Sequence, residues 1–106
     1  MQHPADDAAF DALVASAGDM PVLMKFSAEW CGPCQMIKGD MEALAAEYDG
    51  KMVCIHVDVD NLDGTSQKYG VECMPTIMVI KGGQPHGEKV QGANMNAIKA
   101  LAASAF

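Results

Sequence analysis

The chain has 106 residues, of which 50% are hydrophobic, and a formal net charge of −7. This length suits one ordinary domain with one core, and the hydrophobic content excludes a disordered chain. The negative charge argues against a nucleic-acid or anionic-membrane surface, and no run approaches the roughly 20 apolar residues of a membrane span. We therefore expect a single domain over residues 1–106, without nucleic-acid or membrane partners.

Helix-like and strand-like patterns alternate along the chain. Apolar residues at helical spacing predict helices over Pro4–Ala17, Cys34–Tyr48 and Asn61–Tyr69, followed by a last helix that Asn94 caps. Apolar, β-rich runs predict strands over Pro21–Ser27, Met52–Val59, Thr76–Ile80 and Glu88–Gln91, with a tight turn at Gly82-Gly83. Strands separated by helices, then a hairpin and a helix, predict an α/β domain with a mixed sheet covered on both faces.

The N-terminal segment Met1–Asp7 lacks the basic and apolar pattern of a secretory signal. We therefore expect a cytoplasmic, reducing location. In such a compartment the 4 cysteines indicate catalytic or free thiols rather than a framework of structural disulfides.

The most informative segment is Trp30-Cys31-Gly32-Pro33-Cys34, which follows an apolar run and opens a helical pattern. This spacing suits thiol–disulfide exchange, in which one thiolate attacks a disulfide of another molecule and its neighbour displaces the product. Cys31 is the expected attacking thiolate, because backbone N–H groups and the helix dipole at a helix start lower a thiol pKa. Cys34, about one turn further, is expected to resolve the mixed disulfide.

The residues between the cysteines also suit this chemistry. Gly32 lets another backbone approach closely, and Pro33 fixes the turn and cannot donate a hydrogen bond to the sulfurs. The alternatives are a zinc half-site or two inert thiols. We expect no metal, because a structural zinc needs a closed tetrahedral set of ligands. The remaining candidate ligands offer no second pair at this spacing: Cys54, Cys73, His3 and His56.

Further segments accompany the cysteine pair: Phe26–Glu29, Val57–Asp60, Lys68–Val71, Cys73–Thr76, Lys81–Gln84 and Gln91–Asn94. Together they resemble the thioredoxin family along nearly the whole chain. The resemblance implies the thioredoxin fold, a central mixed β-sheet flanked by helices on both faces. It implies a protein-disulfide reductase that uses no cofactor beyond a redox-active Cys31–Cys34 disulfide. A thioredoxin reductase would re-reduce this pair, and the substrates would be disulfide-containing proteins such as peroxiredoxins.

The resemblance also implies a shallow substrate groove beside the cysteines. Pro75 matches the family's cis-proline, which would turn the Met74 backbone outward to pair with an extended substrate. From the residues alone, a trans proline that starts a strand suits the pattern equally. The rest of the implied groove is Trp30, Gly92 and Ala93. For Trp30 the alternative is ordinary core filling, and Asp60 is implied to accept a hydrogen bond from its indole.

The main departure from the family is Lys25. The family usually has a buried aspartate there, which is held to take a proton from the second cysteine, and a basic residue opposite, here His56. Lys25 has three alternatives. It reaches water, it loses its proton and accepts one from Cys34, or it stays charged and stabilises a thiolate. We include Lys25 among the candidate catalytic residues.

Two further departures concern local structure. Gly39 stands where the family has a helix-kinking proline, so a bend there is not required. Pro4 and the short segment before it argue against the family's first edge strand. The 9 methionines are many for this length. Several at apolar positions are expected to fill the core: Met24, Met36, Met41 and Met78.

The other cysteines have separate interpretations. Cys54 lies in an apolar run and is expected in the core. Cys73, next to the implied groove, is expected to be partly exposed. It is either passive or able to link two monomers by a disulfide under oxidation. Two other function classes stay open: an oxidase or isomerase, and a non-enzymatic interaction subunit. The Gly32-Pro33 pair resembles the reducing members of the family.

Overall fold

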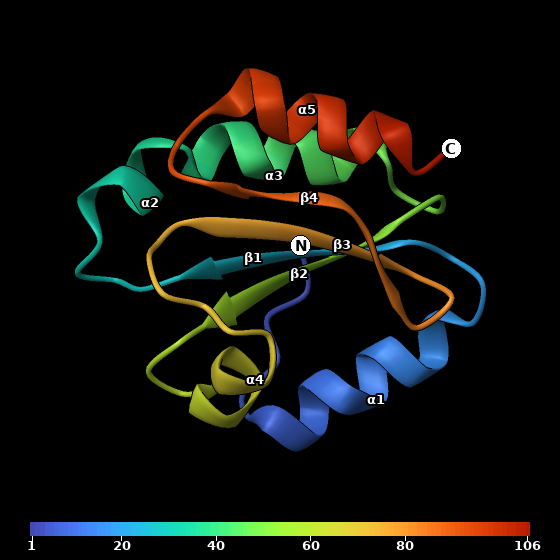
Figure 1. Cartoon of the computed structure of the whole chain (residues 1–106), viewed down its shortest axis with the longest axis horizontal. Coiled ribbons are helices and arrows are strands. Elements are labelled where there is room, and N and C mark those ends of the chain that lie inside the picture. Colours follow the sequence, from blue (N-terminus) through green and yellow to red (C-terminus); the bar gives the residue numbers. More distant parts are fainter.

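The computed structural model describes the whole chain, residues 1–106, as alternating helices and strands (Figure 1). The helices are α1 (Asp7–Ala17), α2 (Gly32–Met36), α3 (Lys38–Glu47), α4 (Asp63–Lys68) and α5 (Met95–Ser104). The strands are β1 (Val22–Ser27), β2 (Val53–Asp58), β3 (Thr76–Lys81) and β4 (Gln84–Gln91). No helix is both long and apolar enough to span a membrane.

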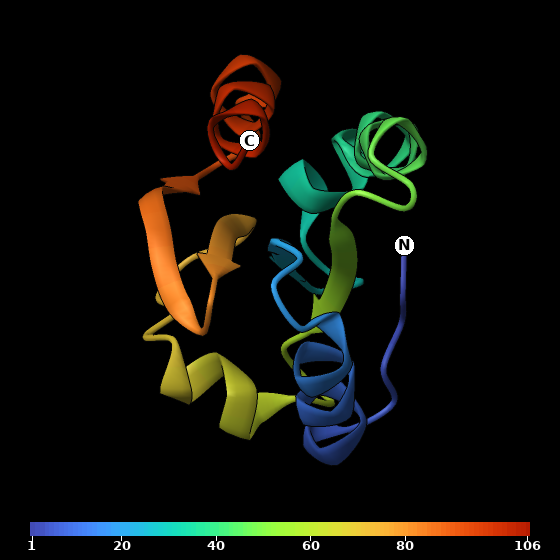
Figure 2. The ribbon, with the colours of Figure 1, turned by 90° about the vertical axis from the view of Figure 1, so that its right-hand side faces the viewer.

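The strands form one mixed sheet in the order β2-β1-β3-β4. β1 runs parallel to β2 and antiparallel to β3, and β4 pairs antiparallel with β3. Helices α3 and α5 cover one face of the sheet, and α1 and α4 cover the other (Figures 1 and 2). The predicted fold class, a mixed sheet flanked by helices on both faces, is confirmed.

The central strand β1 supplies residues to the core on both faces, since all its residues are buried. Side chains alternate between the two faces of a strand. Leu23 packs in the cluster that contains residues of α3 and α5, whereas Met24 and Phe26 pack in the cluster that contains Phe10 of α1. This alternation places Lys25 on the same face as Leu23, toward α3.

The boundaries of three helices differ from the sequence prediction, and the third, α4, is shorter at both ends than the predicted Asn61–Tyr69. α1 begins at Asp7 rather than Pro4, because the Asp6 side chain caps it by accepting a hydrogen bond from the Ala9 N–H at 2.9 Å. The helix predicted over Cys34–Tyr48 is divided at Ile37, whose φ of −98° and ψ of 4° leave the helical range. The helical segment therefore bends before Gly39.

Two edges of the sheet also differ. β4 begins at Gln84 rather than Glu88, and it contains Pro85 and Gly87, which an edge strand tolerates. At the opposite edge the family's first strand is reduced to one bridge between Gln2 and Ile55. That bridge consists of the Gln2 N–H donating to the Cys54 carbonyl and the His56 N–H donating to the Gln2 carbonyl, each at 2.8 Å.

Candidate active site

The two cysteines lie where the chain leaves the sheet and enters α2. Cys31 is the N-cap of α2, and its Sγ accepts a hydrogen bond from the Cys34 backbone N–H at 3.2 Å. Pro33 lies in the first turn, where its fixed φ suits a helix and its missing N–H is no loss. A disulfide joins Cys31 and Cys34, whose Cα atoms are 5.3 Å apart. Local helix formation thus brings the sulfurs together.

The two sulfurs differ in their access to solvent. Cys31 is 5% exposed, and Cys34 is 0% exposed. Both pack against Ala28 of the preceding loop, and Met74 lies against the same small cluster. Cys31 is therefore the member of the pair that keeps some exposure to solvent.

The surface around the disulfide presents exposed apolar side chains. Trp30 is 68% exposed, and its indole N–H donates to the Asp60 carboxylate at 2.9 Å. Core filling by Trp30 is thereby excluded. The expectation that Met36 fills the core is wrong: it ends α2 with 79% exposure. In a helix as short as α2, the sequence does not show whether a hydrophobic residue points into the core or to the surface.

The loop before β3 lies next to the cysteines. The Met74–Pro75 peptide bond is cis. The Gly92 N–H donates to the Pro75 carbonyl at 2.8 Å, so the end of β4 is held beside this loop. Ala93 follows on the exposed surface. The fold thus assembles, around one disulfide, segments that are far apart in the sequence.

Lys25 lies in the middle of β1 with only 2% exposure, opposite His56 of β2 in the strand register. Its ammonium makes neither a hydrogen bond nor an ion pair within 4.0 Å, although it lines a cavity of about 350 Å³. Burial lowers the pKa of Lys25, the Glu42 carboxylate opposes this shift, and the Lys38 charge adds to it. The stem of Lys25 is thus buried. Its Nζ is not among the fully enclosed polar atoms that lack a hydrogen bond, so it keeps contact with the cavity.

His56 shares the surroundings of Lys25. Burial lowers the pKa of its imidazole, and the charges of Lys25 and His3 lower it further, while Asp58 and Glu42 oppose them. The rings of His3 and His56 lie with centroids 5.0 Å apart. Positive groups therefore gather on this side of the sheet and disfavour one another's charge.

The two remaining thiols occupy opposite environments. Cys54 is buried in the cluster that contains Leu23, and burial raises its pKa to about 11. Cys73 is exposed, with its Sγ 4.0 Å from the Thr76 hydroxyl.

The structure contains no group of three or more His, Cys, Asp or Glu side chains placed to hold a metal ion.

Comparison with known proteins identifies the family. The family model described as Thioredoxin matches residues 2–104. The chain belongs to the thioredoxin family. It is 44% identical to thioredoxin from Oryctolagus cuniculus over 92 residues, which span 87% of this chain and 86% of that protein.

Two further comparisons agree with this membership. The chain is 40% identical over 89 residues to the chloroplastic M-type thioredoxin of Zea mays. That alignment spans 84% of this chain and 52% of the maize protein. Among solved structures, that of Fasciola hepatica thioredoxin superimposes with a TM-score of 0.87 at 33% identity, and the match covers 94% of each chain.

Family membership and geometry together define the chemistry of the site. As a thioredoxin-family chain, the molecule is a thiol–disulfide oxidoreductase that acts as a disulfide reductase through its Cys-x-x-Cys pair. Cys31–Cys34 is its redox-active disulfide. The family implies a thioredoxin reductase as electron donor and disulfide-containing substrates as acceptors.

Proposed function

We propose that Cys31 attacks the substrate disulfide and that Cys34 resolves the resulting mixed disulfide. The observation that carries this assignment is the position of Cys31 as the N-cap of α2 with residual exposure, whereas Cys34 is fully buried. Backbone N–H groups at a helix start favour a thiolate. The Cys31 sulfur already accepts one such bond, from the Cys34 N–H.

Electrons and atoms balance in two steps. The Cys31 thiolate attacks one substrate sulfur, the substrate S–S bond breaks, and the departing thiolate takes a proton from water. Cys34 then gives its proton to a base or to water and attacks the Cys31 sulfur. The Cys31–substrate bond breaks, the second substrate sulfur leaves as a thiolate that takes a proton from water, and the Cys31–Cys34 disulfide forms. The substrate gains the electron pair that the dithiol loses.

The substrate-binding surface in this proposal surrounds the disulfide. The backbone N–H and C=O of Met74, which precedes the cis bond to Pro75, offer polar groups to an extended substrate segment. Trp30 offers an exposed aromatic face. Asp60 fixes the Trp30 indole through its hydrogen bond. The remaining groove residues are Gly92 and Ala93, and Gly32 and Pro33 tune the redox pair.

Lys25 is proposed to assist the deprotonation of Cys34. A charged ammonium on this side of the sheet stabilises a nearby thiolate by Coulomb attraction, and a neutral amine accepts the thiol proton. Its burial and its lack of any paired acid support a role in the site rather than a surface role.

We also propose specific partners and a cellular location, which family membership alone does not give. A thioredoxin reductase re-reduces Cys31–Cys34, and peroxiredoxins are among the substrates. The protein acts in the cytoplasm as a monomeric single domain over residues 1–106. Cys73, which is exposed beside Met74, links two monomers under oxidation.

A trapping experiment tests the assignment of the two cysteines. Purified Cys34→Ser is mixed with an oxidised peroxiredoxin, and the adduct is mapped by mass spectrometry. A stable mixed disulfide at Cys31 is expected, because the resolving thiol is missing. Cys31→Ser is the matched control and should give no adduct. An adduct that forms through Cys34 in Cys31→Ser, and not in the other variant, would reverse the two roles.

The dimer proposal has a separate test. Wild type and Cys73→Ser are oxidised with diamide and compared on nonreducing gels. The dimer band should disappear in Cys73→Ser and persist in Cys54→Ser, whose thiol is buried in the parent. An unchanged dimer band in Cys73→Ser would exclude this thiol.

A further inference from the structure

A cavity of about 350 Å³ is lined by Lys25 and His56 of the sheet and by Lys38 of α3. Its wall contains basic side chains from four separate parts of the chain: His3, Lys25, Lys38 and His56. The whole chain has 7 Lys and Arg residues and 3 histidines, against 14 acidic residues. Basic side chains are thus scarce in this molecule, yet they meet at one cavity.

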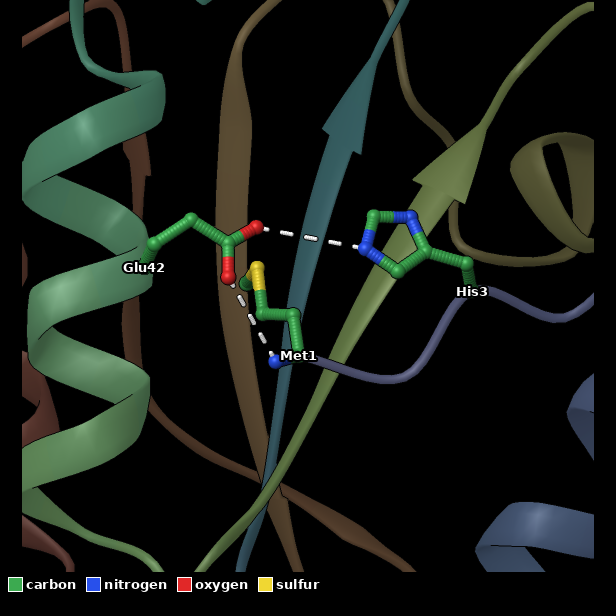
Figure 3. A network of polar contacts seen from close by, with 3 residues as sticks. All are labelled: Met1, His3 and Glu42. Carbon is green, nitrogen blue, oxygen red and sulfur yellow. Dashed lines mark ion pairs between the residues drawn. The ribbon is translucent and has the colours of Figure 1, made fainter.

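The acidic groups that face the cavity have other partners or lie in solvent. The Asp58 carboxylate accepts hydrogen bonds from the Asp60 N–H at 2.9 Å and from the Asn61 amide at 3.3 Å. Glu42 of α3 does not line the cavity, although its charge acts on Lys25. It reaches across to the Met1 amino group at 3.6 Å and to His3 at 3.9 Å (Figure 3). Glu29, the remaining acid of the cavity wall, is exposed.

Lys25 is the group in this wall that lacks a partner. It is 2% exposed, lines the cavity, and has no hydrogen-bond acceptor or carboxylate within reach. An ammonium at a position this enclosed has little water around it and no counter-charge in contact, so an anion that enters the cavity would find a strong electrostatic partner. The cavity is open to an anion, and Lys38 and His56 stand beside it as further donors.

We propose that this cavity binds a small tetrahedral oxyanion of the phosphate or sulfate class, with Lys25 as its principal ligand and Lys38 and His56 as additional donors. A tetrahedral oxyanion has several acceptor oxygens, so it can satisfy an ammonium and an imidazole at the same time, which one halide ion does less well. The volume of the cavity exceeds the space that such an ion needs. This site is independent of the proposed division of labour between the cysteines.

Sulfate is the probe, because it remains a dianion throughout the neutral pH range. The oxidised protein is titrated with sodium sulfate while sodium chloride is reduced to hold ionic strength constant, and backbone amide shifts are followed by NMR. We expect saturable shifts centred on Lys25, Lys38 and His56. Lys25→Met should weaken the apparent affinity at least about tenfold, because it removes the buried charge but keeps the apolar stem.

Lys99→Met is the matched control, because Lys99 is an exposed lysine of α5 outside the cavity wall. It should bind sulfate like the parent. Lys38→Gln removes an exposed cation of the same wall and should weaken binding about threefold, which keeps the proposal testable if Lys25→Met does not fold.

Three results would overturn the proposal. The shifts could follow ionic strength without saturation, they could centre on a surface away from the cavity, or folded Lys25→Met could bind sulfate as tightly as the parent. None of these results would affect the redox function, since the titration measures binding to the oxidised protein and not turnover.

Discussion

Lys25 places an amine in a strand whose every residue is buried. An anion at this position would disfavour a nearby thiolate, whereas a cation favours it. A protonated Lys25 would therefore reverse the sign of the charge beside the redox pair relative to the aspartate that the family usually has there. The loss of this charge should appear in the kinetics of the thiols and not only in stability.

Lys25→Met keeps the length of the side chain but removes its amine. We expect resolution of the mixed disulfide near pH 7 to slow about fivefold, which corresponds to about 1 kcal/mol of lost Coulomb stabilisation. Because burial lowers the pKa of Lys25, its charge declines as pH rises, and the difference from wild type should shrink at alkaline pH. Stopped-flow measurement of resolution against pH, with Lys99→Met as control, checks this. Equal profiles for wild type and Lys25→Met would make Lys25 a bystander.

The two unpaired cysteines should differ sharply in reactivity. Burial raises the pKa of Cys54 from 9.0 to about 11, so its thiolate fraction at pH 8 falls about 100-fold. Cys73 is exposed and should react readily. Iodoacetamide labelling of the native oxidised protein, followed by peptide mass spectrometry, should modify Cys73 at least about 100 times faster. Comparable rates would mean that the strand around Cys54 opens easily.

The role of a side chain could be predicted where it depends on neighbours in the sequence. It could not be predicted where it depends on residues that only the fold brings near. The spacing of Cys31 and Cys34 has a direct chemical meaning, and the redox pair followed from it. The cavity did not, because its wall joins residues that only the sheet and α3 bring together, such as His3 and Lys38. Lys25 stood out by type alone, but its burial depends on the packing of both sheet faces.

At the scale of elements, a side-chain contact ties α1 to α4. The Asp7 carboxylate accepts hydrogen bonds from the Thr65 N–H at 2.9 Å and from the Thr65 hydroxyl at 2.6 Å. These bonds lower the pKa of Asp7, with the Thr65 hydroxyl as the largest cause. The first turn of one helix thus caps the start of another that is distant in sequence.

Asp7→Ala should lower the melting temperature at pH 7. The folded-state pKa of Asp7 lies below 3.8, so its stabilisation is complete above the unfolded value and is lost as pH falls through the folded value. The melting-temperature difference from wild type should therefore persist down to about pH 4 and disappear in stronger acid. Asp11→Ala, on an exposed position of the same helix, is the control. A difference that stays constant with pH would show that packing, and not the carboxylate, holds the two helices.

The sequence predicts which segments are helices and which are strands better than it predicts where each one begins and ends. Periodicity identified every strand, but β4 begins earlier than expected because Pro85 and Gly87 resemble a loop while an edge strand accepts both. The division at Ile37 had no proline or glycine at that position to announce it. Helix ends depend on single capping bonds, such as that of Asp6, which hydrophobic patterns do not encode.

At the scale of the whole molecule, the redox state and the folding stability are linked. A disulfide between residues separated by 3 positions constrains the unfolded chain, and the folded chain already brings the two cysteines together at the start of α2. A pair that is more stable when oxidised drives the reduction of its partners, whereas an oxidant has a stabilised reduced form. The sign of the stability difference between the two states therefore distinguishes a reductase from an oxidase.

We expect the oxidised protein to be more stable than the reduced protein by about 2 kcal/mol. Urea unfolding followed by circular dichroism, with and without a phosphine reductant, should place the oxidised midpoint about 1–2 M higher. Cys34→Ser cannot form the disulfide, so its midpoint should be the same with and without reductant, which separates the effect of the bond from that of the additive. If the reduced wild type unfolds at the higher urea concentration, the fold stabilises the dithiol. The direction of electron flow would then favour the oxidation of partners, and Lys25, as a charge that stabilises thiolates, would be the first residue to examine by repeating the pair of titrations on Lys25→Met.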